Sequence, residues 1–426
     1  MTKPVIGFAG MTHLGINSAA GALGHGFETV CFDADSAHIQ RLKAGELPVS
    51  EPGLPELLTQ HAERVFYTDA ITNLSRCDVV YIATDVPTDD QGQSDLSGIS
   101  LLITEVAAAL APHAVLVVLC QVPPGFTRGL AVPAPRLFYQ VETLVFGRAV
   151  ERAMQPERFI VGCADAAAAL PAAYLEFLQS FACPLLLMRY ESAELSKIAI
   201  NCCLVASVTV ANTLAGVAER IGADWHEIVP ALKLDRRIGA HAYLAPGLGL
   251  AGGNLERDLA TVLRLAGETG SEVSLIESFV KNSRHCRDWV LRALHREVFA
   301  VNPHPAISVL GLAYKENTRS TKNSPSLALL ENLTSWPLRA YDPAVAVCAD
   351  YHPQLTGCAS ALEAVAGADV LIVMTPWPEF RELDPAALAR AMNGQLVIDP
   401  YRVLDGEALA KAGLRYLTLG SGALVG

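Results

Sequence analysis

The sequence predicts an α/β chain in which two doubly wound parallel sheets are joined by a helical middle. Three observations support this fold class. Short apolar runs rich in β-branched residues alternate with helical patterns from residue 4 onward, which is typical of parallel strands joined by crossover helices. A second series of such runs begins at Ile307. Between the two series, from about Ser192 to about Phe299, the pattern favours helix almost throughout.

Each expected element follows from its local pattern. The first domain's expected buried strands are Val5–Ala9, Thr29–Phe32, Val79–Ala83, Ala114–Leu119 and Phe159–Val161. Those of the second are Ile307–Leu310, Leu338–Tyr341, Val370–Met374 and Leu396–Ile398. Glu194–Arg220 contains no proline and, apart from Gly216, no glycine, so we expect a long central helix there. No sequence repeat is strong enough to establish the two sheets as duplicates.

Composition narrows the class of protein. The chain has 426 residues, 51% hydrophobic and 18% charged, which is enough to bury a large core. Its net charge of −12 is spread along the chain, and without a basic run we expect no nucleic-acid partner. We also expect no signal peptide and no apolar run of the roughly 18 residues that cross a membrane. Ten cysteines form no CxxC pair, which favours reduced thiols, a cytoplasmic location and no metal site.

A glycine-rich turn follows the first expected strand. Gly10 and Gly15 are the first and third glycines of a GxGxxG pattern, with Thr12 in the second position and Leu14 before the third. The first glycine makes the tight turn, the second lets a pyrophosphate approach, and the third lets helix and strand pack closely. Asp33 lies about 20 residues further on, where a carboxylate binds ribose and repels a 2′-phosphate. This order predicts a Rossmann-like NAD site; the alternative is a turn without a ligand.

Polar residues at and beyond the expected central helix suggest chemistry on an alcohol. Lys197 and Asn201 are four residues apart, on one face of a helix. A lysine ammonium there can stabilise an alkoxide, and an amide can hold the same oxygen. Two carboxylates can act as bases through a water molecule: Asp258, which we expect on a loop, and Glu142. Taken singly, each is also explained as a solvated charge or a loop cap.

Taken together, these residues and several motifs resemble the UDP-glucose/GDP-mannose dehydrogenase family, from about residue 4 to about residue 405. Gly247–Asp258 resembles that family's active-site loop, Gly-Gly-x-Cys-x-x-Lys-Asp. The other matching segments, in the family's order, are Glu51–Leu54, Thr84 before Val86-Pro87-Thr88, Cys120–Gly125 with Gln121 in place of threonine, Glu142, Glu194–Lys197 with Asn201, Asp235–Gly239, Gly311–Lys315 with Ser324-Pro325, Tyr341–Pro343, and Thr375–Trp377.

The resemblance implies three domains: an NAD-binding Rossmann-like domain at 1–190, a helical dimer-forming centre at 191–300 and a sugar-nucleotide-binding α/β domain at 301–426. It implies oxidation at C6 of a nucleotide-diphosphate hexose, by default UDP-glucose to UDP-glucuronate, by a homodimer that serves polysaccharide biosynthesis. The implied NAD-binding residues are Gly10, Thr12, Leu14, Gly15, Asp33, Thr84 and Gln121. The implied catalytic residues are Lys197, Asn201, Asp258, Glu142 and Asn254, and the implied substrate-binding residues are Arg237, Gly252, Gly253 and Lys315.

Asn254 departs from the family at the centre of the active-site loop. It stands where the family has the cysteine that adds to the C6 aldehyde, and an amide cannot make that addition at neutral pH. Three outcomes follow: the enzyme stops at the aldehyde, it oxidises the aldehyde's hydrate with Asp258 or Glu142 activating water, or it binds without turnover. Cys120 is an alternative thiol near the expected site.

Further departures gather around the expected substrate. The residues that differ from the family are Ala251, Gln121, Phe146, Arg257, Ser320, Lys322, Tyr401 and Arg402. Those that match it are Lys197, Asn201, Gly252 and Asp258. This pattern favours altered substrate or chemistry over decay. The alternatives are a catalytically impaired sugar-nucleotide-binding homologue with a regulatory or partner role, and a β-hydroxyacid dehydrogenase, which the second α/β domain disfavours. His13 lies in the glycine-rich loop, where it could contact the cofactor; a histidine there more often caps its helix, so we assign it no role.

Overall fold

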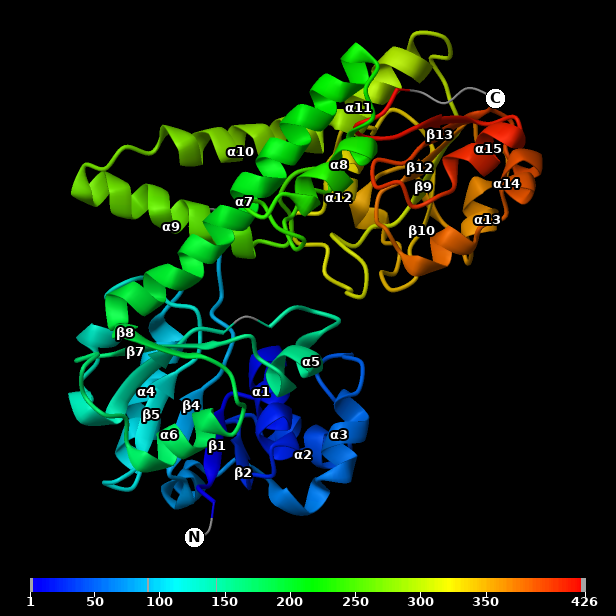
Figure 1. The fold of residues 1–426 in the computed structure, drawn as a ribbon. Coiled ribbons are helices and arrows are strands. Elements are labelled where there is room, and N and C mark those ends of the chain that lie inside the picture. Colours follow the sequence, from blue (N-terminus) through cyan, green and yellow to red (C-terminus); the bar gives the residue numbers. More distant parts are fainter. Residues whose placement is uncertain (1–2, 90–91, 143, 423–426) are drawn as a thin grey trace. The chain divides into compact units, whose positions relative to one another are not determined.

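Two sheets, each covered by helices, appear in the computed structural model, which describes residues 3–89, 92–142 and 144–422 (Figure 1). The chain divides into two units, residues 1–200 and 201–426. Helix α7 (Tyr190–Ile221) begins in the first unit and ends in the second. The predicted fold class, with doubly wound sheets and a helical middle, is confirmed.

The first unit contains an eight-stranded sheet with the order β3-β2-β1-β4-β5-β6-β7-β8. Its strands are β1 (Ile6–Ala9), β2 (Thr29–Phe32), β3 (Val65–Thr68), β4 (Val79–Ile82), β5 (Val115–Val118), β6 (Leu137–Gln140), β7 (Phe159–Cys163) and β8 (Leu185–Arg189). Its helices before α7 are α1 (His13–Gly24), α2 (Ser36–Lys43), α3 (Leu54–Gln60), α4 (Ser97–Ala109), α5 (Ala149–Met154) and α6 (Ala172–Gln179). All neighbouring strands are parallel except β6 and β7, which are antiparallel.

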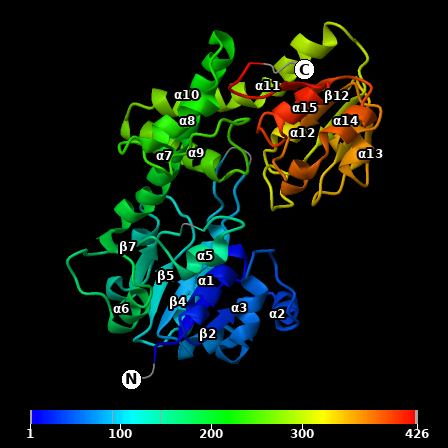
Figure 2. The same ribbon diagram turned by 45° about the vertical axis from the view of Figure 1, so that its right-hand side comes forward.

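Alternation along the strands builds a core on each face of this sheet. Val79 and Tyr81 of β4 pack in one apolar cluster with side chains of α1 and α6. Val80 and Ile82 point to the other face and pack with side chains of α4. Because both faces are covered by helices (Figures 1 and 2), the strands are continuous apolar runs, as buried parallel strands are.

The second unit begins with helices and ends in a six-stranded parallel sheet with the order β11-β10-β9-β12-β13-β14. The first helices after α7 are α8 (Trp225–Leu234), α9 (Asn254–Thr269), α10 (Ser274–Arg287) and α11 (Trp289–Leu294). The strands are β9 (Ile307–Leu310), β10 (Leu338–Tyr341), β11 (Leu355–Gly357), β12 (Val370–Val373), β13 (Leu396–Ile398) and β14 (Arg415–Leu417). The helices between them are α12 (Pro325–Glu331), α13 (Ala361–Val365), α14 (Pro385–Ala391) and α15 (Gly406–Lys411).

Helix α7 is the one helix of the described residues that is long and apolar enough to raise the question of a membrane span. An 18-residue window in this 32-residue helix has a mean hydropathy of 1.8, so the helix is long and apolar enough, by length and composition alone, to cross a membrane. Its hydropathy comes largely from alanine, valine and cysteine, which are interrupted by polar residues and so escape a search for continuous apolar runs. One third of that window is buried. Ala211, Ala215 and Ala218 pack against Trp225.

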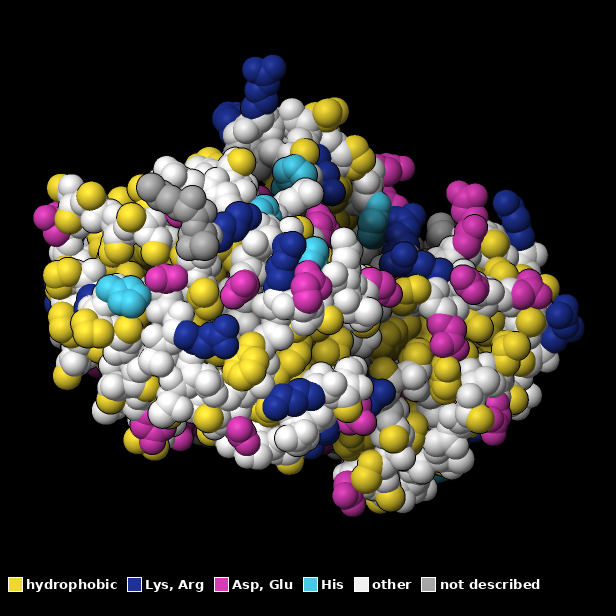
Figure 3. All heavy atoms as spheres, turned by 90° about the horizontal axis from the view of Figure 1, so that it is seen from below, with side chains coloured by type: hydrophobic (Ala, Val, Ile, Leu, Met, Phe, Trp, Pro, Cys, Tyr) yellow, Lys and Arg dark blue, Asp and Glu magenta, His cyan; other side chains and the backbone are white. Residues whose placement is uncertain are grey.

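Charge on the surface is mixed. Figure 3 shows acidic and basic side chains scattered among hydrophobic ones over the face in view. Several of the large exposed hydrophobic residues belong to α7, namely Leu195, Val210, Leu214, Val217 and Ile221.

Candidate functional site

The residues assigned to the cofactor lie along one edge of the first sheet. Asp33 follows β2, the glycine-rich loop follows β1, Thr84 follows β4 and Gln121 follows β5, and these strands are neighbours in the order β2-β1-β4-β5. Parallel strands end at the same edge, so the four segments come together there. The chain reverses its winding between β1 and β4, and ligands of doubly wound sheets bind at such a switch point.

The glycine-rich loop has the geometry that a dinucleotide requires. Gly10 has φ +98°, and a Cβ there would lie 2.9 Å from the backbone nitrogen of Thr84. A Cβ on Gly15 would lie 1.9 Å from the Gly10 carbonyl oxygen, so helix α1 could not start where it does with any other residue. Thr12, at φ −78°, has ordinary backbone geometry. Its hydroxyl lies 3.4 Å from the Ala83 carbonyl oxygen.

Asp33 couples this loop to the second strand. Its Oδ2 accepts the Met11 N–H at 2.9 Å and its Oδ1 accepts the Asp35 N–H at 3.0 Å. Asp35 caps α2, and the His38 N–H, which donates to that carboxylate, is the first cause that lowers the pKa of Asp35. Carboxylates at the ribose end repel a 2′-phosphate, so this edge of the sheet fits NAD better than its phosphorylated form.

A buried glutamate holds the loop after β5. Glu194 in α7 accepts the Gly125 N–H at 2.6 Å and the Thr127 N–H at 2.8 Å. Burial raises the pKa of Glu194, against the lowering effect of these hydrogen bonds. Since Lys197 follows Glu194 by one helical turn, the same contacts fix the start of the helix that carries the predicted catalytic lysine.

Cys120 does not offer a substitute nucleophile. Its side chain is 1% exposed, and Sγ donates to the Ile82 carbonyl oxygen at 3.1 Å. Burial raises the pKa of the Cys120 thiol well above its usual value. Because the thiolate is the reactive form, a thiol in this state is inert.

Glu142 follows β6, one strand beyond Gln121 along the same edge. With Gln140, Arg152 and Arg158 it lines a cavity of about 50 Å³, whose other walls are largely aromatic. Oε1 of Gln140 accepts hydroxyl hydrogen bonds from Tyr81 and Tyr174, each at 3.0 Å. A polar cavity of this size has room for water.

The second unit brings two predicted catalytic residues together. Nδ2 of Asn201 in α7 donates to Oδ2 of Asp258 at 2.5 Å, and the two residues are 8% and 1% exposed. Asp258 was expected on a loop, but it lies in the second turn of α9, which begins at Asn254. Asn254 is exposed and precedes Asp258 by four residues, so both lie on one face of α9. Lys197 precedes Asn201 by one turn of α7.

The two glycines before α9 seat their loop on a neighbouring segment. Gly252 and Gly253 have φ of +86° and +95°. A Cβ on Gly252 would lie 2.6 Å from the Tyr314 ring, and the Gly252 N–H donates to the Lys322 carbonyl oxygen at 3.1 Å. A Cβ on Gly253 would lie 3.0 Å from Cε of Lys322. The loop therefore packs directly on the segment that follows β9.

The second sheet repeats the geometry of the first at its own switch point, between β9 and β12. Gly311 has φ +97°, and a Cβ there would lie 2.5 Å from the Thr375 side chain. Oδ2 of Asp342 accepts the N–H groups of Leu312 and Ala313 at 2.7 and 3.0 Å. These contacts of Gly311 and Asp342 correspond, in the first sheet, to those of Gly10 with Thr84 and of Asp33 with Met11.

Lys315 follows the loop after β9, and its Nζ lies 5.7 Å from the centroid of the Tyr314 ring.

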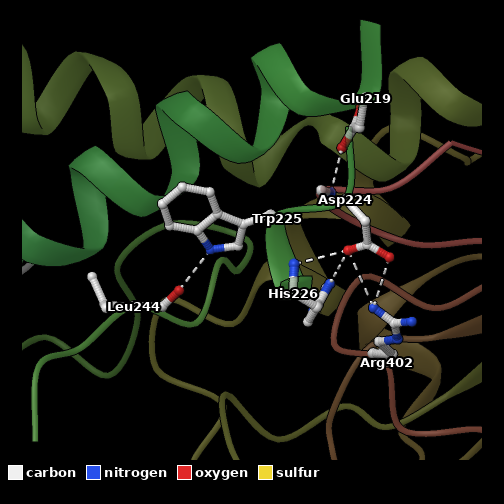
Figure 4. Close-up of polar contacts among 7 residues, drawn as sticks. Glu219, Asp224, Trp225, His226, Leu244 and Arg402 are labelled. Atoms are coloured by element: carbon white, nitrogen blue, oxygen red, sulfur yellow. Dashed lines mark hydrogen bonds and ion pairs between the residues drawn. The ribbon is translucent and has the colours of Figure 1, made fainter. Parts of the chain in front are cut away.

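Arg237 binds its neighbour in the sequence, Asp235. Its guanidinium binds Asp235 through hydrogen bonds of 3.0 and 2.6 Å, and its side chain is 89% exposed. Two contacts at the start of this region, made by Trp225 and Asp224, carry no signal in the sequence. Nε1 of Trp225 donates to the Leu244 carbonyl oxygen at 2.8 Å, and Asp224 binds both His226 and Arg402 (Figure 4).

The fold and this site define an NAD-dependent dehydrogenase with two doubly wound nucleotide-binding domains. The chain belongs to the UDP-glucose/GDP-mannose dehydrogenase family. The family's NAD binding domain matches residues 5–179, its central domain residues 191–284 and its UDP binding domain residues 308–406. NAD is therefore the cofactor, and the substrate is a nucleotide sugar. Within the described ranges, no group of three or more His, Cys, Asp or Glu side chains is placed to hold a metal ion.

Individual relatives span nearly the whole chain. The UDP-glucose 6-dehydrogenase of Rhizobium meliloti is 30% identical over 96% of this chain and 98% of its own length. The UDP-glucose 6-dehydrogenase TuaD of Bacillus subtilis is 28% identical over 99% of this chain and 94% of its own. A UDP-glucose dehydrogenase from Pyrobaculum islandicum has the same fold, with a TM-score of 0.82 at 24% identity, covering 96% of this chain and 98% of that one. So does the UDP-D-ManNAc dehydrogenase of Pyrococcus horikoshii, with a TM-score of 0.81 at 22% identity, covering 98% and 99%.

Proposed function

We propose that this protein oxidises C6 of a nucleotide-diphosphate hexose, with UDP-glucose as the default substrate. The observation that carries the proposal is the buried hydrogen bond of 2.5 Å between Asn201 and Asp258, one helical turn from Lys197. Oxidation of a primary alcohol needs a proton acceptor and groups that stabilise charge on its oxygen, and a carboxylate, an ammonium and an amide can supply them. The relatives named UDP-glucose 6-dehydrogenase support UDP-glucose, and the Pyrococcus horikoshii enzyme's name makes 2-acetamido sugars the first competitors to test.

Each of these groups has a role in the first oxidation. NAD, when bound, accepts the hydride that leaves C6. Asp258 receives the hydroxyl proton, directly or through water. Lys197 and Asn201 stabilise negative charge on the C6 oxygen as the C–H bond breaks. Asn201 also fixes the orientation of the Asp258 carboxylate, because it donates to one of its two oxygens.

The second oxidation must proceed without a thiol at position 254. Addition of water to the aldehyde gives a hydrate, and the hydrate becomes the acid when it loses a proton and transfers a second hydride to a second molecule of NAD. Asp258 or Glu142 activates the water. Asn254 holds the C6 oxygen through its amide. If this protein cannot carry out the second oxidation, it releases the aldehyde.

The substrate is held by residues of the loop before α9 and of the second sheet. Gly252 and Gly253 let this loop pack on Tyr314 and Lys322 and so set its position for the sugar. Lys315 lies by the switch point between β9 and β12, where we place the nucleotide diphosphate. The Arg237 side chain is 89% exposed. We propose that it binds the substrate held by the other subunit of a homodimer. Exposed Val210, Leu214, Val217 and Ile221 follow one another at helical spacing on α7 and supply an apolar face for that dimer.

A reducing compartment suits this chain. All ten cysteines are free thiols, which is typical of proteins that work in the cytoplasm. We therefore propose a cytoplasmic enzyme, without nucleic-acid or membrane partners, that acts on a soluble nucleotide sugar.

A second candidate function is a sugar-nucleotide-binding homologue without turnover, and Asn254 is the observation that favours it. A panel of UDP- and GDP-hexoses, including 2-acetamido sugars, distinguishes the two when each is incubated with NAD. The proposed enzyme forms NADH with at least one sugar, and mass analysis finds the aldehyde, its hydrate or the acid. Tight binding of a nucleotide sugar with no NADH would instead establish the binding homologue.

A further inference from the structure

We propose that His13 is a cofactor-positioning residue, which Glu51 and Phe146 hold so that its Nδ1 donates a hydrogen bond to the diphosphate of NAD. The inference rests on the NAD-binding domain alone and does not depend on which sugar the enzyme oxidises. It goes beyond the glycine-rich loop itself, whose contribution to diphosphate binding is its backbone.

His13 lies at the correct place for this role. It is the first residue of α1, directly after the glycine-rich loop, and the diphosphate of a dinucleotide sits at this helix N-terminus. Thr12, which precedes it, makes no capping hydrogen bond with its side chain. The N–H groups of the first turn are therefore left for a ligand, and any donor on His13 adds to them.

The imidazole is held on two sides. Its Nε2 lies 3.0 Å from Oε1 of Glu51. Its ring stacks on Phe146, with 4.0 Å between the centroids and 22° between the planes. The Glu51 side chain is fully buried and also accepts the N–H groups of Gly147 and Ala149, at 2.9 and 3.2 Å. One carboxylate thus ties the loop that carries Phe146 to the helix that begins with His13.

This arrangement determines the chemistry of the second ring nitrogen. A carboxylate accepts hydrogen bonds, so Nε2 of His13 carries the hydrogen. In the neutral ring Nδ1 is then an acceptor, and in the imidazolium it is a donor. Nδ1 has no hydrogen-bond partner among residues 3–89, 92–142 and 144–422, and the side chain keeps 12% exposure. An anion brought to Nδ1 stabilises the imidazolium and receives a charge-assisted hydrogen bond.

The charged groups on the surrounding segments are compatible with this assignment. Glu51, on the loop before α3, is the acidic partner of Nε2. Arg148 follows Phe146 by two residues, and its guanidinium binds Glu151. Asp33 lies across the glycine-rich loop, bound to the Met11 N–H. Phe146 stands where the resembled family has a glutamate, so no carboxylate from that position competes with a diphosphate for the imidazole.

Two ligands separate the proposed contact from other effects. ADP-ribose contains the diphosphate, whereas adenosine contains only the nucleoside. His13→Phe keeps an aromatic ring for the stack on Phe146 but removes both ring nitrogens. We expect it to weaken ADP-ribose binding by the full-length protein roughly tenfold or more, with adenosine binding unchanged. In the unaltered protein with labelled histidine, the NMR resonance of His13 Nδ1 should shift with ADP-ribose and not with adenosine.

The other end of α1 provides a matched control. His25 stacks on Phe181 with 4.0 Å between centroids, and its Nε2 binds the Met154 carbonyl oxygen at 2.9 Å. His25→Phe should leave ADP-ribose binding unchanged. The proposal is overturned if His13→Phe binds ADP-ribose like the unaltered protein, if it loses both ligands equally, or if ADP-ribose leaves the Nδ1 resonance of His13 unchanged. Since no nucleotide sugar is used, these results are independent of the proposed reaction.

Discussion

Asn201 and Asp258 are joined by a hydrogen bond of 2.5 Å between two helices, from Nδ2 of the amide to Oδ2 of the carboxylate. The residues are 57 positions apart in the sequence and both are buried. Because the amide donates to one oxygen, the orientation of the carboxylate is fixed before any substrate binds. Nε of Arg257 lies 3.4 Å from the other oxygen of Asp258. We propose that this pair serves as the proton acceptor and oxygen ligand of the reaction.

Asp258→Asn should lower kcat by roughly 100-fold or more, because an amide of the same shape cannot accept the alcohol's proton. Steady-state kinetics with NAD and the nucleotide sugar that the panel identifies measure this loss. Asn302→Ala is the matched control, since Asn302 makes an amide-to-carboxylate hydrogen bond to Asp369 at 3.3 Å outside the candidate site. It should keep its activity. An active Asp258→Asn enzyme would remove Asp258 from the reaction.

Lys197→Ala should lower kcat by roughly 100-fold or more, because the ammonium no longer stabilises charge on the C6 oxygen. The affinity for NAD should be unchanged, since Lys197 is outside the glycine-rich loop. Calorimetry with NAD and turnover with nucleotide sugar separate the two effects. Turnover at the normal rate would refute the assigned role.

Trp225→Phe should lower the free energy of unfolding by about 1–3 kcal/mol, because it leaves the buried Leu244 carbonyl without its donor. The loop that contains Leu244 leads to Gly252, so we also expect a higher KM for the sugar and faster proteolysis of residues 235–253. Trp336→Phe is the control: it removes an indole hydrogen bond of 2.9 Å to the Pro303 carbonyl in a more exposed setting. Equal effects of the two changes on KM would contradict the role of Trp225.

Asp399 makes stability depend on pH. Burial raises the pKa of this carboxyl to about 6, against the lowering effect of hydrogen bonds from Leu404 and Tyr416. A folded pKa above the unfolded one means that the folded state binds the proton more tightly. Stability therefore falls as pH rises from the unfolded pKa, near 4, to the folded value, near 6, and stays lower above it.

Asp399→Asn removes this dependence, because an amide does not ionise. The unaltered protein should lose about 1 kcal/mol of its free energy of unfolding between pH 5 and pH 7 relative to the variant. Urea denaturation of both proteins at the two pH values measures the difference. Asp384→Asn, at the exposed N-cap of α14, controls for removal of a carboxylate. Parallel pH profiles for the unaltered protein and Asp399→Asn would contradict the expectation.

Much of the fold could be predicted because the informative signals are local. Central strands such as Val79–Ile82 are buried on both faces and appear as continuous apolar runs. Four of the strands that escaped prediction, β3, β8, β11 and β14, are sheet edges, where one side of the strand lacks a partner. Gly10 and Asp33 were predictable because a dinucleotide loop places strict demands on neighbouring backbone atoms.

The rest depends on contacts between distant residues or on backbone geometry without a side-chain signal. Asp258 was expected on a loop because α9 begins after Gly253 at φ +95°, and no Ser, Thr or Asp marks the start of that helix. His13 meets Glu51 across 38 positions, and Trp225 meets Leu244 across 19. The correspondence between the two switch points is likewise visible only in space, in the contacts of Gly10 with Thr84 and Gly311 with Thr375.

The decisive measurement is the number of NADH molecules formed per UDP-glucose consumed, in the unaltered protein and in Asn254→Cys. We predict that both proteins form NADH and oxidise C6. We also predict a larger fraction of acid, or a trapped thioester, in Asn254→Cys, because a thiol at this position can add to the aldehyde. An unchanged product and rate in Asn254→Cys would show that the loop before α9 does not face C6. If the unaltered protein forms no NADH with any nucleotide sugar, the proposal that it oxidises C6 is wrong.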